Sequence, residues 1–165
     1  MIDTQETRIV KDPSGKKLIV TRFFAAPLTK VWRAWTESRY LDEWWAPRPW
    51  KTQTKTMNFA PGGSWLYAMV GPDNETHWCR TDYQAVEPEK RFTGVGAFCD
   101  ENGRLTDAIP SMQWDIRFTS TGDGTTVNVH LSFDNEASLE KIVQMGFKEG
   151  FTAAHGNLDE LLARL

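Results

Sequence analysis

Residues 111–133, SMQWDIRFTSTGDGTTVNVHLSF, contain two alternating runs on either side of a short glycine-containing loop. Side chains at every second position of a β-strand point to the same face of the sheet. The loop Gly122-Asp123-Gly124 is typical of the connection between two antiparallel strands. The stretch therefore predicts a β-hairpin with one polar and one apolar face, and the apolar positions are Met112, Trp114, Ile116, Phe118, Val127, Val129, Leu131 and Phe133.

The chain before this hairpin contains further runs rich in β-branched and aromatic residues, as strands are. Turn signals separate them, among them Pro61-Gly62-Gly63 and Glu87-Pro88-Glu89. One of the runs has the apolar face Trp65, Tyr67 and Met69. The predicted sheet has about seven antiparallel strands, mainly in a meander, and the additional runs are 16–25, 51–59, 64–70, 76–86 and 90–98.

Two short helices are predicted after the first of these strands. In residues 28–36 and 38–45 the apolar side chains recur at spacings of three and four, which places them on one helical face. Pro47 and Pro49 then end the second helix.

The apolar face of the sheet needs a cover, and the C-terminal run supplies it. Gly146, Gly150 and Gly156 weaken a helix there by roughly 1 kcal/mol each relative to alanine, so we expect close packing or a kink to explain them. The predicted fold class is α+β, a curved antiparallel sheet with one long helix packed across it. The apolar stripe of this helix is Phe147, Phe151, Ala154, Leu158, Leu161, Leu162 and Leu165.

Length and charge limit the organisation of the chain. A chain of 165 residues fits one domain, which we place at 16–165, after a polar tail or short edge element at 1–15. The net charge of −3 lacks the basic excess that nucleic-acid binding requires. The N-terminus has no apolar signal region and no stretch is long enough to span a bilayer. We therefore expect a cytoplasmic protein that neither binds nucleic acid nor inserts into membranes.

The order of these elements is the helix-grip (START-like) arrangement, and several local motifs support it. They are residues 31–36 (VWRAWT), 44–47 (WWAP), 60–65 (APGGSW) and 145–151 (MGFKEGF). With these motifs the chain resembles the SRPBCC superfamily from about residue 16 onward, and more narrowly the activator of heat-shock protein 90 ATPase homologues. It departs from that family's pattern at Asn58, where many members carry Asp, and at Phe151, where Trp is frequent.

The resemblance implies a cavity between sheet and helix, because superfamily members bind lipids, sterols, polyketides or hormones there. We expect a small hydrophobic or amphipathic ligand, and no cofactor is implied. Methionines, Met145 among them, would make the surface adaptable. The resemblance also allows a chaperone as a binding partner, which stays a secondary hypothesis. Self-association into a homodimer is a further alternative, through the Trp44–Trp45 region or an edge strand. The candidate cavity residues are Trp44, Trp45, Trp65, Tyr67, Met69, Trp78, Phe98, Met112, Trp114, Phe147, Phe151 and His155.

A cyclase- or dehydratase-like enzyme is the alternative, and it needs ionisable groups inside the cavity. Arg80 and Asp82 share a face with Trp78, so they form either a buried pair beside the cavity or a surface ion pair. The other polar strand residues considered are His77, Asp115 and His130. We assign no catalytic residue and no metal site, because the spacing of the histidines and cysteines lacks the close pairing that anchors zinc. Both cysteines, Cys79 and Cys99, are expected to be reduced.

Overall fold

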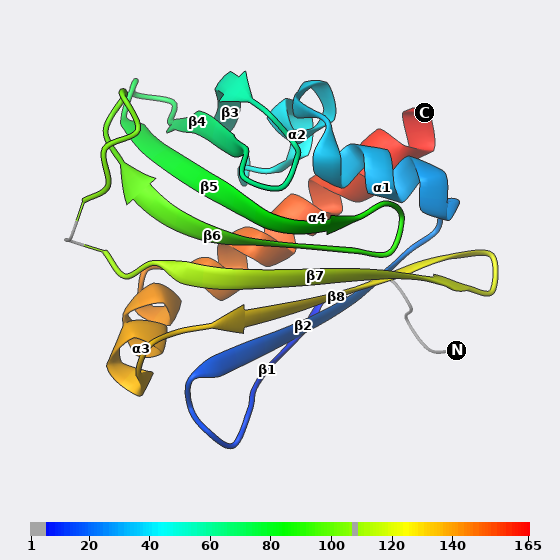
Figure 1. Cartoon of the computed structure of the whole chain (residues 1–165). Helices are drawn as coiled ribbons and strands as arrows, with labels where there is room; N and C mark the ends of the chain where they lie inside the picture. Colours follow the sequence, from blue (N-terminus) through cyan, green and yellow to red (C-terminus); the bar gives the residue numbers. More distant parts are fainter. Residues whose placement is uncertain (1–5, 107–108) are drawn as a thin grey trace.

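The computed structural model describes residues 6–106 and 109–165 (Figure 1). Within them the chain forms eight strands and four helices. The strands are β1 (Arg8–Lys11), β2 (Lys17–Phe24), β3 (Lys51–Met57), β4 (Ser64–Val70), β5 (Thr76–Glu87), β6 (Arg91–Cys99), β7 (Met112–Thr121) and β8 (Gly124–Ser132). The helices are α1 (Leu28–Thr36), α2 (Ser38–Trp44), α3 (Glu136–Gln144) and α4 (Phe147–Arg164).

All strands belong to one antiparallel sheet with the order β1-β2-β8-β7-β6-β5-β4-β3. From β3 to β8 each strand pairs with the next along the chain, so this part is the predicted meander. The first predicted strand, β2, pairs with β8, with Val20 opposite Val129. The α+β helix-grip fold is therefore confirmed, as is the antiparallel hairpin of β7 and β8.

The strand number of about seven was too low by one. The additional strand, β1, lies in the polar segment that we had expected to be a tail or a short edge element. It pairs with β2 at the edge of the sheet, where Val10 stays exposed. An edge strand has solvent beside it and needs little apolar alternation, so its sequence signal is weak. The first five residues of the predicted tail lie outside the described residues.

The two short helices after β2 are confirmed, and they carry much of the core. Trp44 is fully buried, and its indole N–H donates to the carbonyl of Ala34 at 2.9 Å, which ties α2 to α1. Trp35 packs edge-on against Trp44, with ring centroids 4.8 Å apart.

Helix α3 was not predicted from the sequence. Asn135 caps it by accepting a hydrogen bond from the backbone N–H of Ser138 at 2.8 Å. It buries mainly Leu139 and Ile142, so its apolar stripe is short. Gly146 has φ +94°, a left-handed conformation that separates α3 from α4 and that glycine adopts without strain.

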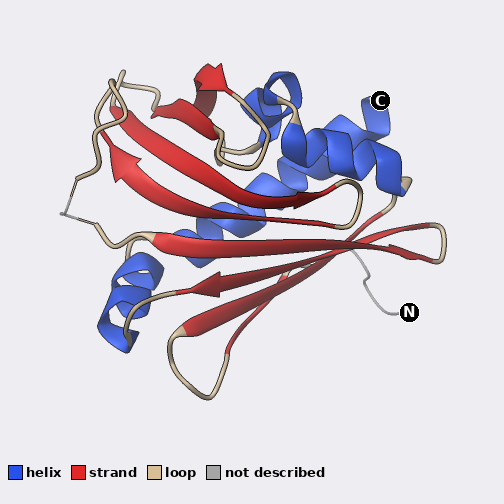
Figure 2. Ribbon diagram, in the orientation of Figure 1, coloured by secondary structure: helices blue, strands red, loops and turns tan. Residues whose placement is uncertain are grey.

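Helix α4 crosses one face of the curved sheet, and the core lies between them (Figures 1 and 2). Its C-terminal end lies beside α1 and α2, and α3 lies near its other end. Among the helices of the described residues, none is long and apolar enough to cross a membrane.

Candidate ligand cavity

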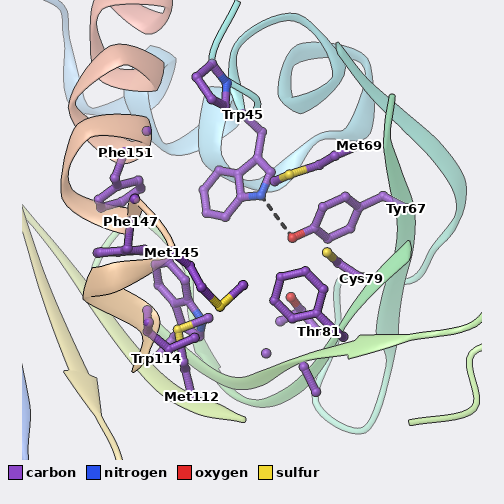
Figure 3. Close-up of a pocket in the computed structure, with 17 residues that line it drawn as sticks. Trp45, Tyr67, Met69, Cys79, Thr81, Met112, Trp114, Met145, Phe147 and Phe151 are labelled. Carbon is purple, nitrogen blue, oxygen red and sulfur yellow. Dashed lines mark hydrogen bonds between the residues drawn. The ribbon is translucent and has the colours of Figure 1, made fainter. Parts of the chain in front are cut away.

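A cavity of about 230 Å³ lies between the inner face of β4 to β7 and the first turns of α4 (Figure 3). The connection from α3 to α4 closes one side, and the segment after α2 closes another. The residues around it are Trp45, Pro47, Tyr67, Met69, Cys79, Thr81, Gly96, Ala97, Phe98, Met112, Trp114, Ile142, Met145, Gly146, Phe147, Gly150 and Phe151.

Strand register assembles the sheet wall of the cavity. Cys79 on β5 stands opposite Tyr67 on β4 and opposite Phe98 on β6, so the three side chains share the inner face. On β6, a Cβ atom at Gly96 would lie 2.7 Å from Nε1 of Trp114. Glycine therefore lets the Trp114 indole lie directly against β6, where a larger residue would displace it.

The helix wall begins at the left-handed Gly146. Phe147 and Phe151 are one turn apart on α4, and their rings stack with centroids 5.2 Å apart. Phe151 also meets Trp114 edge-on at 5.8 Å, which joins helix and sheet. Met145 is 50% exposed, so this flexible side chain lies where the cavity meets solvent.

A hydrogen bond fixes the ring that separates the cavity from the deeper core. The indole Nε1 of Trp45 donates to the hydroxyl oxygen of Tyr67 at 3.0 Å (Figure 3). Trp45 also contacts Trp114 and Phe151, with centroids 5.7 and 6.0 Å away. Its position therefore depends on both walls.

The cavity wall is neutral. Among the described residues that line it there is no Asp, Glu, Lys, Arg or His. Burial raises the pKa of the Cys79 thiol to about 12 and raises the pKa of the Tyr67 hydroxyl well above its ordinary value. Both groups are therefore protonated at neutral pH. The wall suits an uncharged molecule, because nothing in it would compensate the desolvation of an ion.

The structure brings eight of the twelve candidate residues together around the cavity. They are Trp45, Tyr67, Met69, Phe98, Met112, Trp114, Phe147 and Phe151. Met145, expected from the sequence as adaptable surface, lines it too.

The other four candidates lie elsewhere. Trp44 belongs to the core between α1 and α2. The ring of Trp65 stacks on that of Tyr67, with centroids 3.9 Å apart, and supports it from outside the cavity. Trp78 alternates with the inward Cys79, so it faces the outer side, where Nζ of Lys55 lies 5.7 Å from its ring.

His155, the fourth, is buried in the core. Its Nδ1 lies 2.9 Å from the hydroxyl oxygen of Thr7. Its ring packs against that of Phe151, with centroids 4.2 Å apart. Burial lowers its pKa to about 3. It is thus a neutral core histidine behind the cavity wall.

The sequence did not single out several lining residues. Cys79 and Thr81 were not predicted, because the large aromatic Trp78 on the same strand favours the opposite face of β5 as the apolar one. Ile142 was missed together with α3. The alternation of β5 against its neighbours could have identified the first two. The others are Pro47, Gly96, Ala97, Gly146 and Gly150.

The ionisable strand residues lie away from the cavity. Arg80 and Asp82 form an ion pair at 2.8 Å on the outer face, and each side chain is more than a third exposed. Asp115 pairs with Arg91 at 3.0 Å, also outside the cavity. Of the two alternatives for Arg80 and Asp82, the surface ion pair is the one observed.

The residues considered for a metal site are also apart. His77 stacks on Trp50 with centroids 5.5 Å apart. Cys79 faces the cavity, whereas Cys99 stands opposite Trp78 on the outer face. Both cysteines are free.

Comparison with solved structures finds the same fold in bacterial proteins. Protein Ms6760 from Mycobacterium smegmatis is 27% identical, with a TM-score of 0.88 over 95% of this chain and 96% of that one. A protein from Arthrobacter aurescens is 25% identical, with a TM-score of 0.89 over 96% of this chain and 92% of that one. Protein NE0264 from Nitrosomonas europaea is 27% identical, with a TM-score of 0.81 over 93% of this chain and 97% of that one.

No curated protein matches the chain. The family model described as "Activator of Hsp90 ATPase homolog 1-like protein" matches residues 25–163. This range runs from the end of β2 almost to the end of α4, and so includes every cavity-lining residue. The chain therefore belongs to the Activator of Hsp90 ATPase homolog 1-like family within the SRPBCC superfamily.

Proposed function

We propose that this protein binds a small, neutral and largely apolar molecule in the cavity between β4 to β7 and α4. The observation that carries the proposal is the uncharged wall of this space of about 230 Å³. Ligand sites are concave, mostly apolar and supplied with a few polar groups.

The size of the cavity limits the ligand. An apolar cavity of about 150 Å³ is enough for benzene. The larger volume here suits a molecule of one or two rings. Met69, Met112 and Met145 lie around it, and their flexible thioethers can adapt to ligands of different outline.

Two polar groups of the wall have hydrogen-bonding capacity to spare. The hydroxyl of Tyr67 is not one of them, because it accepts from Trp45 and also hydrogen-bonds the Cys79 side chain. Neither the Thr81 hydroxyl nor Nε1 of Trp114 has a hydrogen-bond partner among the described residues, and both residues line the cavity. These groups favour a ligand that carries an acceptor.

Other interpretations have less support. Acid–base catalysis would need ionisable groups in the cavity, and Arg80 and Asp82 are on the outer face. A docking face for a protein partner would need a contiguous apolar patch. The large apolar side chains exposed among the described residues come from four parts of the chain, namely Val10 on β1, Leu105 after β6, Met145 after α3 and Leu165 after α4.

Native mass spectrometry of gently purified protein tests the proposal. We expect a stoichiometric apolar passenger, or one-to-one uptake of an added neutral two-ring compound such as 2-ethylnaphthalene. Met112→Trp places a large ring in the cavity and should abolish this binding. The matched control is Gln113→Trp, because Gln113 is the next residue on β7 and hydrogen-bonds Gln84 away from the cavity. Equal binding by both variants would refute the cavity as the site.

A further inference from the structure

The sheet wall of the ligand cavity has no side chain at Gly96, and an indole edge lies over this position. Gly96 stands opposite Thr81 on β5, and both residues line the cavity. The atoms nearest to a Cβ atom at Gly96 would be Nε1, Cδ1 and Cε2 of Trp114, at 2.7, 3.2 and 3.8 Å. The nitrogen-bearing edge of the indole is therefore the part of Trp114 that lies against the cavity wall here. We call Thr81, Gly96 and Trp114 the polar corner.

The N–H of Trp114 is a free donor in the polar corner. Trp114 is only 7% exposed, and its Nε1 has no hydrogen-bond partner among the described residues. Unlike Nε1 of Trp35, this nitrogen is not closed off from solvent. Because it lies beside Gly96, which lines the ligand cavity, the cavity is the space to which it is open.

Thr81 brings a second donor to the same place. Opposite residues in an antiparallel pair have Cβ positions about 4.5–5.5 Å apart, and with glycine at position 96 no side chain stands between Thr81 and the indole edge. The Thr81 hydroxyl has no hydrogen-bond partner among the described residues and is not closed off either. Figure 3 shows Thr81 and Trp114 at the same end of the cavity, below Trp45. One acceptor atom in the polar corner could therefore meet both donors.

The chemistry of these donors defines the group that they would bind. An indole N–H only donates, whereas a carbonyl oxygen has two lone pairs and can accept from two donors at once. Among the described residues that line the cavity there is no Lys, Arg or His to balance an anion. A carboxylate would thus lose its hydration without compensation, and a neutral carbonyl would lose much less.

We propose that the polar corner binds a neutral carbonyl oxygen of the ligand, with the Trp114 N–H as principal donor and the Thr81 hydroxyl as the second. This inference rests on the proposed function and deepens it, because it names the ligand class as neutral ring compounds that carry a carbonyl group. A purely apolar ligand in the same position would cover both donors and leave them unpaired, which weakens its binding.

The test compares two ligands of matched shape, 2-acetylnaphthalene and 2-ethylnaphthalene, which differ by a carbonyl in place of a methylene group. Their affinities are measured by displacement of the neutral fluorescent probe 1-aminoanthracene. The wild-type protein should bind the ketone about fivefold or more tightly than the hydrocarbon, as one net hydrogen bond allows. The carboxylate 2-naphthoate should bind more weakly than the ketone.

Variants assign this preference to the polar corner. Trp114→Phe removes the N–H and also reduces the ring, so its readout is the affinity ratio of the two ligands, which should fall close to one. Thr81→Val keeps the shape of the side chain without its hydroxyl and should lower the ratio about twofold or more. It also provides a reading if Trp114→Phe folds poorly. Thr126→Val makes the same exchange on β8, outside the cavity, and should keep the ratio.

The outcomes separate the two proposals. If the wild-type protein binds ketone and hydrocarbon equally, or if the ratio survives both Trp114→Phe and Thr81→Val, the carbonyl assignment is wrong and the cavity proposal stands. A ratio that falls as far in Thr126→Val as in Thr81→Val would also overturn the assignment. If neither ligand nor the probe binds, both proposals fail together.

Discussion

The indole N–H of Trp45 donates a hydrogen bond of 3.0 Å to the hydroxyl oxygen of Tyr67. This bond joins the segment after α2 to the centre of β4, and both residues line the ligand cavity. Tyr67 is in turn stacked on Trp65 at 3.9 Å. The shape of the cavity thus depends on a chain of aromatic contacts.

Removal of the Tyr67 hydroxyl should destabilise the protein. In Tyr67→Phe the partly buried Trp45 N–H loses its acceptor, and we expect a loss of about 0.5–1.5 kcal/mol in the free energy of unfolding. Tyr83→Phe is the matched control, because the Tyr83 hydroxyl has no partner among the described residues, and it should change stability much less. Urea denaturation measures both, and equal losses would show that the hydrogen bond contributes nothing.

Gly96 should not tolerate a side chain. A Cβ atom there would lie 2.7 Å from Nε1 and 3.2 Å from Cδ1 of Trp114, so the indole would have to move. We expect Gly96→Ala to destabilise the protein by about 1–3 kcal/mol and to reduce ligand affinity, because Trp114 forms part of the cavity wall. Thermal unfolding and probe titration check this. Unchanged values in both would contradict the close packing of Trp114 on β6.

Gly156 should behave in the opposite way. It lies in the middle of α4, is exposed, and a Cβ atom there would meet nothing within 4 Å. Of the two explanations that the sequence offered, close packing or a kink, close packing therefore does not account for this glycine. Gly156→Ala should stabilise the protein by about 1 kcal/mol through helix propensity, which raises Tm by roughly 2–4 °C. A lower Tm would reveal a constraint at this position.

His155 should make the stability depend on pH. Its pKa is lowered to about 3 in the folded protein by burial and by the charge of Arg22, from an ordinary value of 6.5. Between these values the unfolded chain binds the proton and the folded protein does not, so stability falls as the pH drops below about 6.5. We expect a loss of about 2 kcal/mol between pH 7 and pH 5 from this group.

Denaturant titrations at several pH values measure this dependence. Replacement of His155 by Phe should flatten the curve between pH 5 and 7, although it also removes the contact with Thr7. His130→Gln is the control, because His130 is only partly buried on the other face of β8, and most of the slope should remain. An unchanged slope in the His155 variant would contradict a neutral, buried imidazole.

Sequence alone predicted most of the fold, because period-two alternation and helical spacing are strong signals in long elements. Trp114 and Phe151 could be placed on facing surfaces from these periods alone. Short elements were less predictable: β1 is polar at a sheet edge, and α3 has a brief apolar stripe. Eight of the twelve candidate residues lie around the cavity. Trp78 was assigned to the wrong face because β5 has polar residues on both faces, and only its register with β4 and β6 shows which face is inward. Trp78 therefore lies on the outer face, whereas Cys79 lines the cavity.

The most direct test of the central claim is the affinity of 1-aminoanthracene for the wild-type protein, Met112→Trp and Gln113→Trp, measured by fluorescence titration after circular dichroism has shown that all three are folded. We predict saturable one-to-one binding to the wild type and to Gln113→Trp, and a loss of at least tenfold in Met112→Trp, because the larger ring would occupy part of the space of about 230 Å³ from the sheet side. Undiminished binding by Met112→Trp, or no saturable binding by the wild type, would contradict a ligand cavity between the sheet and α4.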